Sequence, residues 1–576
     1  MANMEGKILS ARQKEWVLPA ALPAAALAQL GPRPILAALL YARGLHDAEA
    51  RDHFFNSHYP QGLHDPFLLK GMDIAAPRVA RAIAEKEALA VYGDFDTDGV
   101  TAVTLLMQAI QALGGQIRPY IPHRLREGYG LNLEAVEQLA QEGVKLLITV
   151  DCGITNVAEV SRAQALGMDV IVTDHHQPPP LLPPAFAVID PKQPGCQYPY
   201  KQLVGVGIAY KLVQALVKQG MRLNLRGRDL LDMVALGTVA DMGPLQGENR
   251  VLVKAGLEAL NQTQRPGLQA LIKVAGLKLG QIDSTEISFM LGPRLNAAGR
   301  LDDADLAYKL LLAPDLATAE KLAKELDSLN KQRQKLTKEI FTAIQSNVPR
   351  ENWQNQRIVI LDAEEYPAGI VGLVASKLVE LWGRPVVLVE RGPEMSRGSA
   401  RSVSGCNLFA ILDECRELFS RFGGHSAAAG FSLDTAKLPA LKERLQTLAA
   451  TQIADNLLIP KLLIDALLPL SAVNNELYTE LVQFEPFGQA NFQPTFMTEK
   501  VTVEKVRTMG ADKQHLRLTV RQNDSNSIEA VAFDLGHLAD TLLKAQVIDL
   551  AYALEMNEWN GESSLQLRVK DVRWAS

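Results

Sequence analysis

Aspartates gather where apolar segments of this chain end. The segment VYGDFDTDGVTA places Asp94, Asp96 and Asp98 at alternate positions, between a strand-like pattern (ALAVY) and a helix-like pattern (VTAVTLLMQAIQAL). Carboxylates that lie close together need a compensating positive charge, and a bound divalent metal ion supplies one. Acids at a helix start also stabilise the helix by about 0.3 to 1 kcal/mol, so a helix cap explains this segment equally well.

Later apolar segments end in similar groups. KLLITVDCG leads to Asp151, DVIVTDHH leads to Asp174, His175 and His176, and DMVALGTVADMGP leads to Asp241. Because the carboxyl ends of neighbouring parallel strands open onto one crevice, we expect these residues to share a site. Separate caps or surface loops would explain each residue singly, but not their gathering at successive strand ends. A ligand set of carboxylates and imidazoles favours manganese or magnesium. The absence of a nearby pair of cysteines argues against a structural zinc site.

Composition limits the class of protein without naming its function. A chain of 576 residues with 47% hydrophobic and 22% charged residues is ordinary for a soluble globular protein of about three or four domains. It contains no apolar run of about 20 residues and no signal-peptide core, so we expect no membrane span and a cytoplasmic location. The scattered cysteines fit a reducing compartment. They are Cys152, Cys196, Cys406 and Cys415.

The net charge of −6 would not by itself suggest a polyanionic partner. Binding of nucleic acid would therefore have to depend on local basic patches and on metal ions.

Changes of pattern along the chain predict its domains. Strand-like runs alternating with helix-like runs predict an α/β domain with a doubly wound parallel sheet, followed by a long helix without glycine or proline. A second, smaller α/β pattern comes next, and short alternating runs then predict a small β-barrel. We expect an N-terminal lead-in over 1–70, the domain with the acidic residues over 71–310, the helix over 311–348, the second domain over 349–455 and the barrel over 456–576.

The segments DFDTDG, VDCG, TDHH and VADM, in this order, resemble the DHH phosphoesterase superfamily, which is named after the Asp-His-His seen here at 174 to 176. YIPHRLREGYGLN, GPRLNAAGRL, FGGHSAAAG and FEPFGQANFQPTF narrow the resemblance to the single-strand-specific exonucleases of that superfamily. The resemblance covers nearly the whole chain. It implies metal-dependent hydrolysis of phosphodiester bonds of single-stranded DNA from the 5′ end, with release of 5′-mononucleotides, in DNA repair and recombination.

The same resemblance implies a parallel-sheet DHH domain, a DHHA1-type substrate-binding domain and a C-terminal OB-fold. Two divalent ions, Mn²⁺ or Mg²⁺, would activate a water and stabilise the attacking and leaving oxygens. Asp151 is expected to bridge both ions, and His176 to contact the scissile phosphate or assist proton transfer. Asp94 and Asp174 are expected as further ligands or as acids that orient ligands. The expected ligand set is Asp96, Asp98, Asp151, His175 and Asp241.

One position departs from a related pattern. The pyrophosphatase branch of the superfamily has a histidine four positions before its first metal-binding aspartate, and this chain has Tyr92 there. The first ion is therefore expected to be held less tightly, or to be completed by Asp94 and water.

Donors for phosphate oxygens are expected in GPRLNAAGR, GSARS and FGGHSAAAG. Arginine can bind a phosphate through two hydrogen bonds, and paired glycines let the backbone approach a ligand closely. Surface arginines and a structural turn are the alternatives. Ser399 and Arg401 are candidates to hold the 5′ end, in a cleft too narrow for a duplex. The candidate substrate-binding residues are Arg294, Asn296, Arg300, Ser399, Arg401, Gly424 and His425.

Two other functions are consistent with parts of the sequence. A phosphodiesterase acting on short oligonucleotides or cyclic dinucleotides would not need the strand-binding barrel, in which Trp559 is a candidate for base contact. A non-catalytic DNA-binding scaffold would be expected to have lost some ligand carboxylates, and all are present. By resemblance, we expect a monomer that binds single-stranded DNA and works with a DNA helicase and a single-strand-binding protein.

Overall fold

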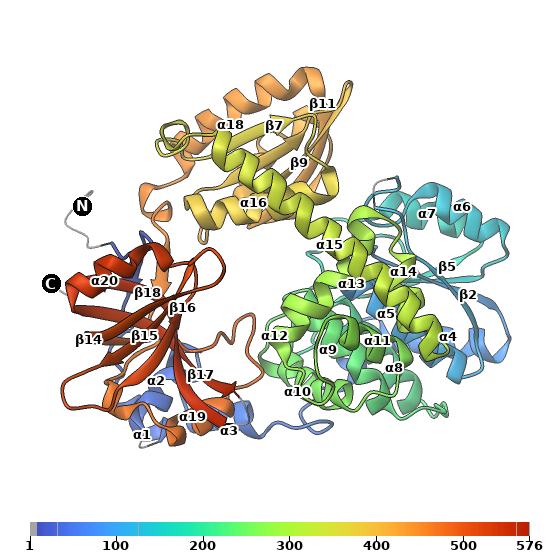
Figure 1. Ribbon diagram of the computed structural model, residues 1–576. Helices are drawn as coiled ribbons and strands as arrows, with labels where there is room; N and C mark the ends of the chain where they lie inside the picture. Colours follow the sequence, from blue (N-terminus) through green and yellow to red (C-terminus); the bar gives the residue numbers. More distant parts are fainter. Residues whose placement is uncertain (1–8, 32, 125, 560–561, 575–576) are drawn as a thin grey trace. The chain divides into compact units, whose positions relative to one another are not determined.

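The computed structural model describes residues 9–31, 33–124, 126–559 and 562–574. The chain forms two compact units (Figure 1). The first unit comprises Ser57–Thr342 and Pro486–Asn491. The second unit comprises Met1–Asn56, Ala343–Glu485 and Phe492–Ser576.

A five-stranded parallel sheet forms the centre of the first unit. Its strand order is β3-β2-β4-β5-β6, so the chain reverses direction across the sheet between β3 and β4. The apolar runs become buried strands, because a parallel sheet is covered on both faces. The sequence prediction of a doubly wound parallel sheet is confirmed. The strands are β2 (Ala88–Gly93), β3 (Gln116–Tyr120), β4 (Leu146–Val150), β5 (Asp169–Thr173) and β6 (Ala187–Ile189).

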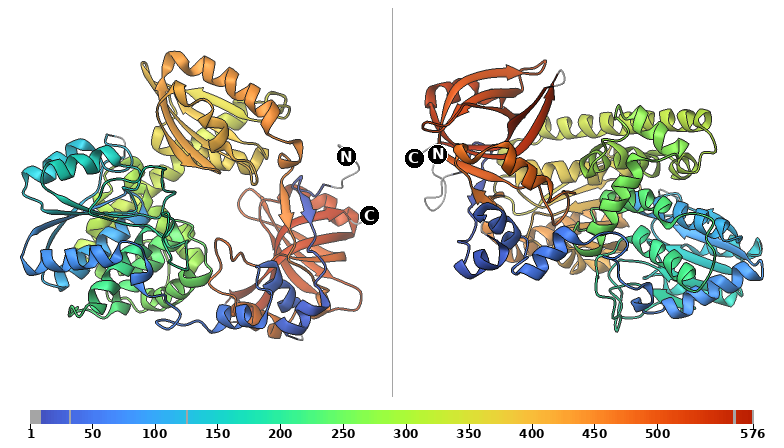
Figure 2. Two further views of the ribbon diagram at one scale, coloured as in Figure 1. Left: turned by 180° about the vertical axis from the view of Figure 1, so that it is seen from behind. Right: turned by 90° about the horizontal axis from the view of Figure 1, so that it is seen from below.

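Helices cover both faces of this sheet (Figures 1 and 2). The larger core joins one face to α4 (Met72–Ala84), α5 (Thr97–Ala112) and α8 (Gly205–Lys218). A smaller core joins the other face to α6 (Leu133–Gln141) and α7 (Val157–Ala165). Both layers leave the carboxyl ends of the strands at one edge of the sheet, where the acidic segments begin.

A helical subdomain completes the first unit. Its helix α9 packs against α5 and α8 and is buried along almost its whole length. A short π-helical turn, Ile287–Leu291, precedes α13. The long predicted helix is present as α15, and it runs out of the first unit into the second. The helices are α9 (Leu231–Ala240), α10 (Gly247–Asn261), α11 (Pro266–Val274), α12 (Ser284–Glu286), α13 (Gly292–Leu301), α14 (Asp305–Leu311) and α15 (Leu316–Asn347).

The second unit contains a mixed five-stranded sheet of order β10-β11-β9-β8-β7. Only β7 and β8 pair in parallel, and the other pairings are antiparallel. Helices α16 (Ala368–Trp382), α17 (Leu408–Asp413) and α18 (Leu438–Gln452) accompany it. The predicted second α/β domain is therefore present. Its strands are β7 (Val359–Ala363), β8 (Val386–Glu390), β9 (Met395–Arg401), β10 (Phe419–His425) and β11 (Ala428–Asp434).

The short alternating runs near the C-terminus form a closed barrel, as predicted for an OB-fold. β14 pairs with β15 along one half and with β17 along the other, so the sheet closes on itself. The short strand β13 (Ala466–Leu467) adds to β14, and α20 (Ala539–Ala545) lies between β16 and β17 along the chain. The Asn560–Gly561 turn lies outside the described residues. The strands are β14 (Phe496–Met509), β15 (His515–Arg521), β16 (Ile528–Ala532), β17 (Val547–Trp559) and β18 (Glu562–Trp574).

The N-terminal lead-in is partly a strand, which its polar sequence did not predict. β1 (Glu15–Val17) pairs in parallel with β12 (Lys461–Leu463). The indole of Trp16 donates a hydrogen bond to the buried Asp571 of the barrel at 3.1 Å. Three helices follow: α1 (Ala24–Leu30), α2 (Pro34–Ala42) and α3 (Ala48–Asn56). Among the described residues, no helix has the length and apolar character needed to cross a membrane.

Candidate metal centre

The loop after β2 carries the first three acids. The carboxylate of Asp96 accepts hydrogen bonds from the backbone N–H groups of Asp98 and Gly99, at 2.9 and 3.2 Å, and so caps helix α5. Gly99 is required there, because a Cβ atom would lie 2.4 Å from the carbonyl oxygen of Asp94. The cap and the metal site are therefore not alternatives, since one tight turn positions all three carboxyl groups at the strand end.

Asp98 is held by the first turn of α8. Its two carboxylate oxygens accept hydrogen bonds from the N–H groups of Gly205 and Val206, at 2.6 and 2.9 Å. A Cβ atom at Gly205 would lie 2.6 Å from the Cβ of Asp151 and 2.9 Å from Asp98 Oδ2, so only glycine fits. Burial and the charge of Asp96 raise the pKa of Asp98 to about 7, against the effect of the helix N–H groups.

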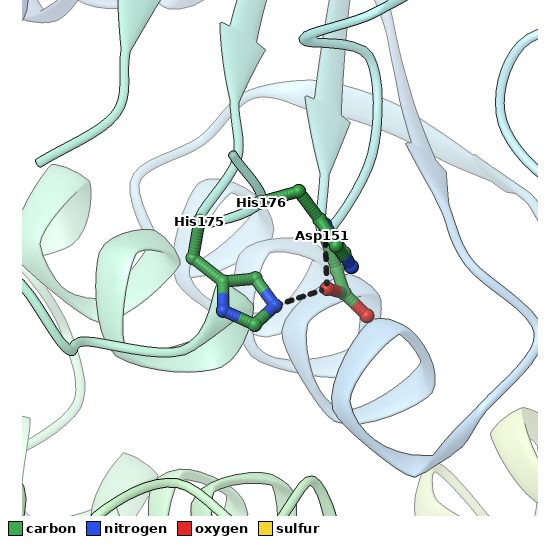
Figure 3. Close-up of side chains that lie close together, drawn as sticks. All are labelled: Asp151, His175 and His176. Carbon is green, nitrogen blue, oxygen red and sulfur yellow. Dashed lines mark hydrogen bonds and ion pairs between the residues drawn. The ribbon is translucent and has the colours of Figure 1, made fainter. Parts of the chain in front are cut away.

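Asp151 lies at the centre of the site. It follows β4, is 3% exposed and has φ of 60°, a left-handed conformation that aspartate and asparagine adopt more readily than most residues. Figure 3 shows both imidazoles beside its carboxylate: His175 Nε2 lies 2.9 Å and His176 Nδ1 4.0 Å from Oδ1. Burial, together with the charges of Asp98 and other acids, raises the pKa of Asp151 well above its ordinary value.

Asp174 orients the residues that follow it. Its carboxylate accepts hydrogen bonds from the backbone N–H groups of Ile154, His175 and His176, and from His176 Nδ1 at 2.7 Å. Burial alone would raise the pKa of Asp174, but the hydrogen bond and charge of His176 lower it to about 2. Burial likewise opposes the charge of His176, yet Asp174 raises the pKa of that imidazole to about 9. The pair is therefore ionic at neutral pH.

The acids and histidines form three overlapping groups, in each of which one ligand atom per residue lies within 4.8 Å of the others. Asp151 and His175 each belong to two of these groups, whereas Asp174 belongs to none. Asp94 is 5% exposed, and its buried Oδ1 has no hydrogen-bond partner within the described chain, as expected for an oxygen that faces a cation. The groups are Asp151–His175–His176, Asp98–His175–Asp241 and Asp94–Asp96–Asp151.

Tyr92 contributes to the core and not to this cluster. Its hydroxyl donates a hydrogen bond to the carbonyl of Gly130 at 2.9 Å and accepts one from Asn132 at 3.2 Å. Its ring stacks on Tyr120 with centroids 5.0 Å apart. The two expectations for this position, a more weakly held first ion or completion of its site by Asp94 and water, both stay predictions.

The predicted phosphate donors of GPRLNAAGR have differing surroundings. Arg294 is 9% exposed and bonds through Nε to Asp327 at 3.0 Å and through Nη1 to the carbonyl of Met290 at 2.7 Å, so its guanidinium already has partners. Asn296 accepts hydrogen bonds from the N–H and hydroxyl of Thr97, at 2.8 and 3.0 Å, and so supports the acidic loop. Arg300 lies in the last turn of α13.

The remaining predicted donors lie in the second unit. Arg401 on β9 donates a hydrogen bond to Ser399 Oγ at 2.9 Å, and Gly372 of α16 leaves room for its guanidinium. Gly424 has φ of 147°, and a Cβ atom there would lie 2.3 Å from the carbonyl oxygen of Ala428. His425 follows it and pairs with Ala428 in the β10–β11 hairpin.

Sequence reasoning missed several residues that build the site. Gly237 of α9 faces the cluster, since a Cβ atom there would lie 2.8 Å from Asp98 Oδ1. Tyr129 places its hydroxyl 3.3 Å from the Asp151 carbonyl and 3.1 Å from His176 Nδ1. The Nζ of Lys192 donates to the carbonyl of His175. Tyr129 stood in the noted motif YIPHRLREGYGLN, and Gly237 in the apolar segment that leads to Asp241. A helix glycine or a single lysine such as Lys192 carries no distinguishing signal of its own.

Comparisons with known proteins agree with this geometry. Residues 88–238 match the DHH family N-terminal domain, residues 355–451 the DHHA1 domain and residues 464–571 the RecJ OB domain. A parallel sheet with an Asp-His-His site at its carboxyl edge, followed by these two domains, defines a DHH phosphoesterase.

The particular family follows from longer matches. The chain is 40% identical over 546 residues to the single-stranded-DNA-specific exonuclease RecJ of Bacillus subtilis (strain 168), across 94% of this chain and 68% of that protein. A crystal structure of Thermus thermophilus RecJ with Mn²⁺ matches 97% of this chain and 80% of its own, at a TM-score of 0.82 and 31% identity. The Mg²⁺ complex of that protein matches 97% and 78%, at a TM-score of 0.76 and 28% identity. This chain belongs to the RecJ family.

Proposed function

We propose that this protein is a metal-dependent exonuclease that hydrolyses phosphodiester bonds of single-stranded DNA from the 5′ end and releases 5′-mononucleotides. One observation carries the proposal: a cluster of buried and half-buried carboxylates and imidazoles gathers at the sheet edge of a RecJ-family chain. The relatives' names supply single-strand specificity and exonuclease activity. The 5′ polarity, the products and the role in repair and recombination rest on the family resemblance.

We assign the cluster to two divalent ions, Mn²⁺ or Mg²⁺. The pKa values of Asp151 and Asp241 are raised by burial and by neighbouring acids, and one buried oxygen of Asp94 has no hydrogen-bond partner among the described residues. Bound cations would stabilise the charged form of these carboxylates. Asp151 belongs to two of the ligand groups and has two carboxylate oxygens, so it would hold both ions, as the superfamily resemblance implies, and Asp94 would be a further ligand. Two bound ions would supply an activated water and stabilise the attacking and leaving oxygens. The proposed ligands are Asp96, Asp98, Asp151, His175 and Asp241.

His176 is assigned to the phosphate. Its Nδ1 lies 2.7 Å from a carboxylate oxygen of Asp174, which fixes the ring, and we assign Nε2 to the substrate. Because Asp174 raises the pKa of His176 to about 9, the ring carries a proton at neutral pH and donates from Nε2. Such a donor can stabilise charge on a phosphate oxygen or protonate a leaving oxygen.

The outer face of the barrel supports the strand-binding part of the proposal. Arg507 on β14 and Arg517 on β15 are cross-strand partners, both exposed, and neither forms an ion pair among the described residues. Like charges directly opposite each other repel, so a phosphate backbone would relieve them. Phe533, 43% exposed, follows β16 with the guanidinium of Arg568 at 5.8 Å from its ring centroid, and offers a surface for a base. The side chain of Trp559 lies outside the described residues.

Further parts of the proposal rest on the family resemblance. We assign Arg300, Ser399, Arg401, Gly424 and His425 to binding of the substrate, with Ser399 and Arg401 at its 5′ end. The domain limits given above, a cytoplasmic location, a monomeric state, and a helicase and a single-strand-binding protein as partners belong to the same proposal.

End-labelled single- and double-stranded DNA and RNA, incubated with Mn²⁺, Mg²⁺ or chelator, test the proposal directly. We expect mononucleotides from the 5′ end of single-stranded DNA only, and none in chelator. Release from the 3′ end would reject the proposed polarity. Cleavage confined to dinucleotides would instead support the phosphodiesterase alternative.

A further inference from the structure

Cations outnumber acids where α13 meets α15. Asp327 of α15 uses one carboxylate oxygen for Arg294 Nε at 3.0 Å and the other for Lys331 Nζ at 2.7 Å. Asp327 is 5% exposed, and each of its oxygens already forms an ion pair with one of these two cations. A third cation, Arg333, lies further along α15.

Arg333 is held in place by a neutral residue. Its Nε and Nη2 both donate to Oδ1 of Asn330, at 3.1 and 2.9 Å, and Asn330 is 1% exposed. Within the part of the chain that the structure describes, Arg333 forms no ion pair, and its Nη1 donates no hydrogen bond. The side chain is half-buried, and burial together with the charge of Arg294 lowers the pKa of Arg333.

Arg333 is half-buried and has no carboxylate partner among the described residues. A guanidinium taken partly out of water normally pairs with a carboxylate, because its lost hydration must be replaced. Here one edge is fixed by an amide oxygen, and the other edge, with Nη1, has no partner among the described residues. The planar guanidinium can donate hydrogen bonds from its Nη1 edge to an anion. Phosphate suits it, because the two N–H groups of one guanidinium edge match the spacing of two phosphate oxygens.

The location connects this cation to the proposed metal centre. Helix α13, which contributes Arg294, also contributes Asn296, whose Oδ1 accepts a hydrogen bond from the N–H of Thr97 at 2.8 Å. Thr97 lies between Asp96 and Asp98 in the acidic loop. Both contacts lie within the first unit, so α13 links the acidic loop to Asp327 of α15, the helix that carries Arg333.

We propose that Arg333 binds a backbone phosphate of the substrate strand other than the scissile one, and so positions the strand at the metal centre. The proposal rests on the function proposed above. Arg333 takes the role that the sequence assigned to Arg294, because Arg294 is already paired with Asp327, and it would act together with Arg300 of α13.

The test measures binding of a fluorescent oligothymidylate by the full-length protein in chelator, from about 50 to about 200 mM salt. Arg333→Ala is expected to weaken binding at least about tenfold, the effect of losing one charge-assisted hydrogen bond. The slope of log K against log salt should fall by about 0.7, the value for one phosphate of a single strand. Arg333→Lys, which keeps the charge without the fork, should retain the slope and bind less tightly than the parent protein.

Lys338→Ala is the matched control, because Lys338 is an exposed cation on the same helix about 140° further round. Its affinity should stay within about twofold of the parent. Circular dichroism and thermal melting establish folding, and Arg333→Gln replaces Arg333→Ala if the latter unfolds. Unchanged affinity and slope in the folded Arg333 variants, or an equal loss in Lys338→Ala, would overturn the inference. Failure of the parent protein to degrade single-stranded DNA with Mn²⁺ would instead overturn the proposed function.

Discussion

Replacing Asp151 by asparagine is expected to abolish hydrolysis and to stabilise the metal-free protein at the same time. Asp151 is 3% exposed and shares ligand groups with two other acids, Asp94 and Asp96. Asparagine has the same shape and tolerates the φ of 60° found there, so the local fold should be retained. The substitution therefore removes a charge and little else.

The size of the stabilisation follows from the distances. Ligand oxygens of Asp94, Asp96 and Asp151 lie within 4.8 Å of one another, and two full charges at that distance repel by about 3.5 kcal/mol at an effective dielectric of about 20. Partial protonation relieves some of this, because the pKa of Asp151 is raised. We expect the free energy of unfolding without metal to rise by about 1 to 3 kcal/mol at pH 8. An acid whose folded pKa is raised loses its stabilising contribution as pH rises, so the gain should be smaller at pH 5.

Urea unfolding in chelator at both pH values measures the stability, and release of mononucleotides with Mn²⁺ measures the activity. Loss of a ligand should lower kcat by more than about 100-fold, since loss of a group that merely orients a ligand costs 10- to 100-fold. Asp190→Asn is the control: Asp190 is another buried acid, its pKa raised by burial to about 7, outside the ligand groups. The Asp190→Asn protein should be more stable than the parent protein and should keep its activity. A destabilised Asp151→Asn protein, or one that keeps Mn²⁺-dependent hydrolysis, would refute the reasoning.

Three further predictions concern other parts of the molecule. The metal-free protein should lose stability as pH rises from about 4 through about 7, because the pKa of Asp98 is raised to about 7 in the folded state. The apparent Mn²⁺ affinity, measured by calorimetry, should rise over the same pH range. A stability and an affinity that do not change with pH would contradict this prediction. Tyr92→Phe should lower the free energy of unfolding by about 1 kcal/mol, through its lost hydrogen bonds, without changing Mn²⁺ affinity, whereas a tenfold weaker affinity would place Tyr92 in the metal site. Replacing Arg507 and Arg517 by alanine should lower the salt slope of single-strand binding by about 1.4, and an unchanged slope would exclude this face of the barrel.

Much of the fold could be predicted from the sequence, because its signals are local. Apolar runs such as KLLITV have the composition and length of buried strands, and alternation with helix-like runs specifies a parallel sheet. The same reasoning predicts that Asp151 and His175 lie at neighbouring strand ends, and the structure brings them to 2.9 Å. By contrast, the pairing of β1 with β12 joins residues more than 400 positions apart, and no local pattern indicates it.

The limits of prediction at the site have a common physical cause. Whether Arg294 is available to a phosphate depends on Asp327, a residue of another helix, and the structure shows the two bonded. Arg333 was not indicated by its own segment of sequence. Its guanidinium lacks a carboxylate partner because Asp327, the nearby acid, pairs with Arg294 and Lys331. Asp174 and Asp94 were equivalent in sequence. In the structure, backbone and imidazole donors bind Asp174, whereas one oxygen of Asp94 has no partner among the described residues.

The sequence by itself therefore determined which chemistry this protein could perform, since residue types and strand ends follow from short segments. Only the tertiary structure decided which side chains remain available for it. Whether a carboxylate or a guanidinium is already hydrogen-bonded or is available to a ligand depends on residues that are distant along the chain. Burial determines how much free energy a charged group loses without such a partner. The opening aspartates illustrate both. Their spacing predicted the site, and the folded chain made Asp96 a helix cap within it and left Asp94 with a buried oxygen that has no hydrogen-bond partner among the described residues.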